Sequence, residues 1–179
     1  RMDGFQNNPT LNIDRSFGFF NPKIGYQFNK NGWVHYASYA IGHKEPNRDD
    51  FEVGAATQPN REQLQDLEVG LEKRNKKTTW TANFYYMHYK DQLVLTGKIN
   101  DVGAYTRMNV PNSYRLGIEL MHTTILTSKL QLSSNITFSR NKIKSFTEFI
   151  DNYDTGNQDA ITRNNTDIAF SPNFIAAST

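Results

Sequence analysis

Apolar and polar side chains alternate along much of this chain with a period of two residues. In the segment that ends at Phe28, the residues Ile24, Tyr26 and Phe28 share one parity, while Lys23 and Gln27 share the other. Successive side chains of a β-strand point to opposite faces, so this period predicts strands with one apolar face. The pattern recurs in five segments, and two further segments, around 33–42 and 80–89, alternate less cleanly because tyrosines occupy both faces. No segment shows a convincing helical period. The chain is therefore predicted to be all-β, with about seven antiparallel strands.

Each alternating segment divides its residues between an apolar and a polar face. The apolar positions are Ile24, Tyr26, Phe28, Leu67, Val69, Leu71, Leu116, Ile118 and Leu120. The charged positions between them are Lys23, Glu68, Glu72, Arg115 and Glu119. The same parity holds over "LQLSSNITF" and is expected near the end of the chain, where Ile168, Phe170 and Phe174 are predicted to share a face.

The connections between these segments alternate in length. Short polar turns are predicted at 29–32, 74–77 and 127–129. Polar stretches of roughly 20 residues, with the Gly, Pro, Asn and Asp residues that break regular structure, are expected to form long loops near 43–63, 93–113 and 141–165. In an up-and-down sheet this order places all short turns at one end of the strands and all long loops at the other.

A sheet with one apolar face fits two environments. A soluble β-sandwich covers that face with a second sheet, and its strands are typically about 5–6 residues long. A transmembrane β-barrel turns that face to lipid with strands of about 10 residues, short periplasmic turns, long extracellular loops and aromatic girdles. The length of the strands and the segregation of the turns favour the barrel. Tyr26, Phe28 and Trp33 near the first short turn are predicted interface aromatics.

Composition agrees with a barrel and excludes several other classes. The mean hydropathy is −0.69, which suits a fold in which half of each strand and all loops are wet. Aromatic residues make up 13% of the 179 residues, too many for a disordered chain. The net charge of +2 gives no basic footprint for nucleic acid, and the absence of cysteine excludes disulfides and thiolate metal sites.

Longer stretches of the sequence resemble a known family. "FFNPKIGYQFNKNGWVHYASYAIGHKEPNRDDF", "LEVGLEKR", "FYYMHYKDQLVL", "NVPNSYRLGIEL" and "NITFSRNKI" follow one another in the order and spacing of TonB-dependent outer-membrane receptors, especially those of Bacteroidetes-type bacteria. The resemblance runs from Phe19 to about Ile150, and "SPNFIAAS" fits the following strand. No single motif is decisive, but the five in series are specific.

The resemblance implies a closed barrel of about 22 strands with an N-terminal plug domain in its lumen. Such a receptor sits in the outer membrane of a Gram-negative bacterium, in contact with lipid. It binds a small-molecule metal chelate, often an iron–siderophore complex, and imports it when the TonB complex acts on the plug. Haem, cobalamin or an oligosaccharide are alternative cargoes. A plugless porin or a barrel adhesin is the alternative class of protein.

Residues 1–179 are expected to be an internal part of the barrel, because seven strands cannot close and neither a plug nor the C-terminal strands are recognised. The apolar positions would then face lipid and the charged positions would face the lumen. The sequence carries no GxSxG, HExxH, P-loop or dinucleotide motif. It is therefore predicted to have no catalytic residues, no cofactor and no resident metal site.

Candidate cargo contacts lie in the expected extracellular loops. Arginine binds anionic chelates through charge-assisted hydrogen bonds, and aromatic side chains stack on flat ligands. A charged run in a loop is more often simply solvated, so each residue is a candidate only. The candidates are His43, Arg48, Asp49, Asp50, Tyr105 and Arg107.

Overall fold

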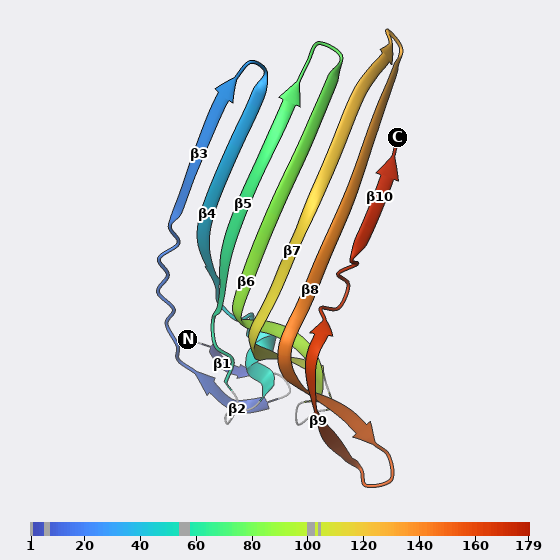
Figure 1. The fold of residues 1–179 in the computed structure, drawn as a ribbon. Helices are drawn as coiled ribbons and strands as arrows, with labels where there is room; N and C mark the ends of the chain where they lie inside the picture. The colour runs from blue at the N-terminus through green and yellow to red at the C-terminus, as the bar shows by residue number, and fades with distance from the viewer. Residues whose placement is uncertain (1, 6–7, 54–57, 100–102, 104) are drawn as a thin grey trace.

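The computed structural model describes residues 2–5, 8–53, 58–99, 103 and 105–179. Its main element is one antiparallel sheet in which strands that follow one another in sequence also pair. The strands are β3 (Lys23–Lys30), β4 (Trp33–Lys44), β5 (Glu62–Arg74), β6 (Thr78–Ile99), β7 (Tyr105–Thr127), β8 (Leu130–Asn152), β9 (Asn157–Asp167) and β10 (Phe174–Ser178). Both β9 and β10 pair with β8, one after the other along its length (Figure 1). The sheet therefore has seven strand positions, and the predicted up-and-down all-β fold is confirmed.

A second, small sheet was not predicted. It pairs β1 (Met2–Phe5) with β2 (Asn8–Ile13) and lies beside the 3-10 helix η1 (Arg48–Val53), at the lower end of the sheet in Figure 1. Ile13 and Phe51 are buried against each other, and Phe17 packs on them. Among the described residues, no helix is long and apolar enough to cross a membrane.

The three short turns lie together at the other end of the sheet, as the spacing predicted (Figure 1). The first is a two-residue turn of Asn31 and Gly32, with φ angles of 52° and 75°. Two successive positive φ angles define the type I′ turn, whose twist matches that of a hairpin. A Cβ on Gly32 would lie 2.9 Å from the carbonyl oxygen of Arg74, so glycine also fits the space.

Two of the three expected long loops are instead paired strands, so that part of the prediction is wrong. Within 93–113, β6 and β7 stay paired as far as Ile99 and Tyr105, and within 141–165, β8 and β9 pair as far as Asn152 and Asn157. The residues that usually break strands are accommodated where the pairing of the strands is irregular. Pro111 lies opposite Asp91, which has a φ of 55° and interrupts the pairing of β6 with β7. Proline has no N–H to donate, and the interrupted pairing does not require one at this position.

The strand register places the predicted apolar and charged positions on opposite faces of the sheet. Paired residues share a face, and one row across the sheet runs Tyr26, Ala37, Val69, Phe84, Ile118, Phe138, Phe174. All nine apolar positions fall on this side, called the apolar face. The five charged positions fall on the other side, called the polar face. The apolar face is uncovered: Ile24 is 73% exposed and Ile118 is 48% exposed.

Two tyrosine rings lie across glycines of the neighbouring strand on the polar face. Tyr36 pairs with Gly70 and Tyr85 pairs with Gly117. A Cβ on Gly117 would lie 2.6 Å from the Tyr85 hydroxyl and 2.7 Å from the carbonyl oxygen of Phe138. One of these neighbours is backbone, so the clash cannot be relieved by rotating a side chain alone.

Replacing Gly117 with valine is therefore expected to lower the free energy of unfolding by about 1–3 kcal/mol, the usual cost of overpacking. A urea titration of the purified protein measures the effect. Gly42 is the matched control, because it also lies within a strand and a Cβ there meets nothing within 4 Å. Equal losses for Gly117→Val and Gly42→Val would contradict the role of the tyrosine contact.

Candidate functional site

The polar face carries the charged and hydrogen-bonding side chains that could meet a ligand or a protein partner. Its centre is lined by residues from β5, β6, β7, β8, β10 and the segment before β10, around a cavity of about 310 Å³. Arg115 is its basic group, and its Nη1 donates a hydrogen bond of 2.7 Å to the hydroxyl of Ser171. Glu68 and Glu119 line the same cavity. Three of the five predicted charged positions thus line one cavity on the polar face.

Side-chain contacts along this face include one that crosses a whole strand and one within a single strand. The Tyr36 hydroxyl donates to Oδ1 of Asn83 at 3.0 Å, across β5. Glu72 forms an ion pair of 2.8 Å with Arg74 on its own strand. These contacts are partly exposed, and exposed ion pairs contribute little stability. The polar face is therefore a partly exposed surface rather than a packed core.

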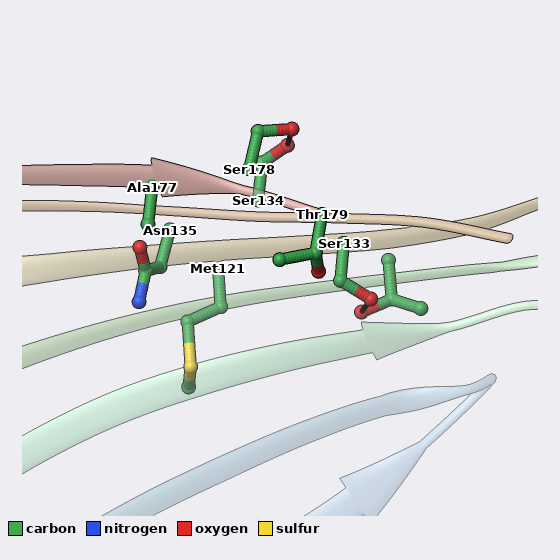
Figure 2. Close-up of a pocket in the computed structure, with 8 residues that line it drawn as sticks. Met121, Ser133, Ser134, Asn135, Ala177, Ser178 and Thr179 are labelled. Atoms are coloured by element: carbon green, nitrogen blue, oxygen red, sulfur yellow. Dashed lines mark hydrogen bonds between the residues drawn. The ribbon is translucent and has the colours of Figure 1, made fainter.

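At the short-turn ends of β7, β8 and β10 the polar face carries uncharged side chains. A shallow cavity there is lined by Met121 and Asn135 on one side of the sheet and by Ser134 and Ser178 on the other (Figure 2). The hydroxyls of Ser134 and Ser178 hydrogen-bond each other at 3.0 Å. Its lining has no ionisable side chain, so it offers no charge for an anionic chelate.

The predicted loop candidates lie at the end of the sheet opposite to the short turns, and two of them, Asp50 and Arg107, are in direct contact. Nε and Nη2 of Arg107 donate hydrogen bonds of 2.7 Å to the two carboxylate oxygens of Asp50. The Asp50 side chain is only 3% exposed, and one of its oxygens also accepts the backbone N–H of Asn47. This pair fastens η1 to β7 across 57 residues of sequence. Both residues were predicted as candidates, but nothing in the sequence predicted that they contact each other.

His43 is engaged through both ring nitrogens. Nδ1 lies 2.8 Å from the Asn21 side-chain oxygen, and Nε2 lies 3.0 Å from the Gln63 amide nitrogen. The ring also stacks on Phe19, with centroids 5.5 Å apart. In the part of the chain that the structure describes, no three His, Cys, Asp or Glu side chains gather as metal ligands. Arg48 and Asp49 are exposed on η1.

Tyr105 lies at the start of β7 and is 63% exposed. Its hydroxyl donates to Oδ2 of Asp151 on β8 at 3.3 Å. The negative charge of Asp151, followed by this hydrogen bond, raises the pKa of the Tyr105 phenol above its ordinary value, because ionisation would place two negative charges side by side. Tyr105 is therefore positioned by β8 rather than joined to Asp50 and Arg107.

Replacing Asp151 with asparagine is expected to lower the pKa of Tyr105 back towards 10.0. Since the folded-state pKa is raised, the contribution of this contact to stability is complete below the unfolded pKa and is lost as the pH rises through the folded value. An NMR titration of ring-labelled tyrosine measures the shift, with Tyr105→Phe to assign the signal. An unchanged pKa in Asp151→Asn would contradict the contact.

Comparison with known proteins identifies the class of fold. The model of the family "TonB dependent receptor-like, beta-barrel" matches residues 1–177. The chain belongs to this family, whose members are receptors and transporters of the outer membrane of Gram-negative bacteria. No curated protein sequence matches the chain.

Solved structures that share the fold include two transporters. The copper transporter OprC superposes with a TM-score of 0.56 at 16% sequence identity, over 68% of this chain and 20% of that chain. The FrpB iron transporter from Neisseria meningitidis (F3-3 variant) superposes with a TM-score of 0.55 at 12% identity, over 88% of this chain and 31% of that chain. The chain thus spans less than a third of the length of either transporter.

Proposed function

We propose that this chain is part of the barrel of an outer-membrane receptor that binds a scarce nutrient and imports it with energy transduced by TonB. The observation that carries the proposal is the two-faced sheet. Long strands expose one apolar face and one polar face, and their short turns gather at one end. In a soluble protein a second layer would cover such an apolar face.

In this proposal the apolar face contacts lipid and the polar face lines the lumen. The membrane contact is then made by the apolar face of the strands, and no hydrophobic helix is needed. The row of Trp33 and Trp80 near the short turns supports an interface at that end. Lys73 lies over the Trp33 ring at 5.0 Å, and His122 stacks on Trp80 at 3.9 Å. Aromatic and basic side chains are common where lipid meets water.

We infer that other parts of the same receptor close the barrel and fill it. The sheet leaves β3 and β10 as edges, and unpaired backbone groups are very costly in lipid. Residues 1–179 would then be one stretch of a barrel of about 22 strands, with the plug domain and the C-terminal strands supplied by further sequence.

The proposed cargo is a metal chelate, with an iron–siderophore complex as the specific candidate. Both structural relatives are named as metal transporters, for copper and for iron. Among the loop candidates, Arg48, Asp49 and Tyr105 are exposed and suit direct contact with cargo. Asp50 and Arg107 instead hold η1 in place, and His43 is held by Asn21 and Gln63. We propose that these three position the loop end of the site.

Uptake by cells tests this function. A strain that lacks the gene for the whole receptor should lose uptake of a ferric siderophore from a panel of chelates, and the restored gene should return it. A protonophore should abolish that uptake, because TonB draws on the proton gradient. Uptake that survives the protonophore would favour a plugless porin, and loss of cell attachment without loss of any uptake would favour an adhesin.

A further inference from the structure

The strand that follows β8 is interrupted by a bulge, defined here as residues 168–173. Asp167 pairs with Lys142 and Phe174 pairs with Phe138, so seven residue steps of the chain span only four steps of β8. The three extra residues reverse which face of the sheet the odd and even side chains point to. Ile168 lies on the polar face, and Phe170 lines the polar-face cavity, whereas Phe174 lies on the apolar face. The prediction that Ile168, Phe170 and Phe174 share one face is therefore wrong.

The bulge is held in place without any contribution from the Phe170 ring. Ile168 is 6% exposed and packs with Val110 and Ile143. Beyond Phe170, the hydroxyl of Ser171 accepts the hydrogen bond from Arg115, and the carbonyl of Pro172 accepts one of 2.9 Å from the Ser139 hydroxyl. Both ends of the bulge are thus fixed by groups other than Phe170.

Phe170 itself is fully exposed and conformationally strained. Its relative exposure is 102%, and its φ of 56° lies in the left-handed region that bulky side chains avoid. Backbone strain of this kind persists where the surrounding structure imposes it, and it is concentrated at functional positions. Ile175, which lines the same cavity, is 47% exposed. The bulge therefore presents an uncovered apolar spot in the middle of a polar face.

We propose that Phe170 is an anchor for the plug domain of the same receptor, an inference that rests on the proposed function. The plug segment would place an apolar side chain against Phe170 and Ile175, and a basic side chain near Glu68 and Glu119. Arg115 does not neutralise both carboxylates, and its Nη1 is already directed to Ser171.

The position of the bulge along the strands supports a plug partner over an incoming cargo. Arg115 lies in register with Ala40, which is seven residues from Trp33 at the short-turn end. A membrane-spanning strand takes about 9–11 residues. Phe170 thus lies within the spanning part of the wall, where a domain that fills the lumen contacts it. This chain matches only 20% and 31% of the two transporters, so most of each transporter lies outside the matched part and has room for such a domain.

Photo-crosslinking in the full-length receptor tests the anchor. The photoreactive residue p-benzoylphenylalanine is placed at Phe170 in one variant and at Phe174 in another, in intact outer membranes, and cross-linked peptides are mapped by mass spectrometry. Position 170 is expected to join a peptide from the N-terminal domain. Position 174, on the apolar face, is expected to join lipid and no plug peptide.

The outcomes separate the anchor from the function on which it rests. Lipid cross-links at 174 without plug cross-links at 170 would overturn the anchor and keep the membrane barrel. Absence of lipid cross-links at 174 would overturn the barrel assignment itself. A second variant, Phe170→Gly, relieves the backbone strain and removes the ring. It should expose the plug to proteolysis while the barrel keeps its resistance to denaturant, and an equally protected plug would also overturn the anchor.

Discussion

Replacing Arg107 with methionine is expected to destabilise the end of the sheet around η1 by about 3–5 kcal/mol, the cost of leaving a buried charge without its partner. The Asp50 carboxylate is almost fully buried and takes two hydrogen bonds from Arg107. Methionine preserves most of the side-chain volume but offers no positive charge or donor. Hydrogen exchange of peptides that cover η1 measures the loss, because these amides should open without unfolding of the whole sheet.

Arg163→Met is the matched control. Arg163 also donates to a carboxylate at 2.7 Å, that of Glu148, but the two side chains are 44% and 37% exposed. Water screens and solvates such a pair, so its loss should cost less than about 1 kcal/mol. Similar exchange rates in the two variants would show that burial of Asp50 does not govern the stability of this region. Loss of cargo binding in Arg107→Met with unchanged exchange would assign Arg107 to cargo contact instead.

Replacing Ile118 with arginine is expected to destabilise the inserted barrel by about 2–4 kcal/mol if the residue lies near mid-membrane. Ile118 lies in the middle of the apolar face, between Phe84 and Phe138. A guanidinium at this place must either be desolvated by lipid or distort the bilayer. A folding titration of the whole receptor in lipid vesicles measures the change in free energy.

Thr137→Arg places the same side chain on the polar face of the next strand. Thr137 pairs directly with Glu119, so a cation there gains an opposite charge and keeps its water. Its effect on stability should be small. Equal losses for the two arginine variants would contradict the assignment of the two faces to lipid and lumen, and the membrane part of the proposed function would fail with it.

The polar face derives its shape from contacts that single strands do not encode. The rings of Tyr36 and Tyr85 each lie over a glycine of the next strand, at a place where any Cβ would clash with them. Against this surface the bulge at Phe170 stands out. In the proposed receptor, the exposed Phe170 ring would give a plug domain one defined contact on this wall.

The sequence by itself determined the features that depend on neighbouring residues. The two-residue period assigned Ile118 and Glu119 to opposite faces, because successive side chains of any strand point in opposite directions. Asn31 and Gly32 specified a tight hairpin, because both positions need positive φ angles. The serial motifs also identified the family, since they keep its order and spacing.

Only the tertiary structure decided the features that depend on residues far apart in sequence. The stretches 93–113 and 141–165 contain turn-forming residues, yet long-range pairing extends them as strands, because each backbone group gains a partner. Asp50 finds Arg107 across 57 residues, and nothing local marks that contact. In the sequence Phe170 continues the apolar alternation. The pairing of β9 and β10 with β8, however, leaves more residues between these two strands than β8 has positions opposite them. Strand pairing at a distance, which local periodicity does not contain, turned that ring to the polar face.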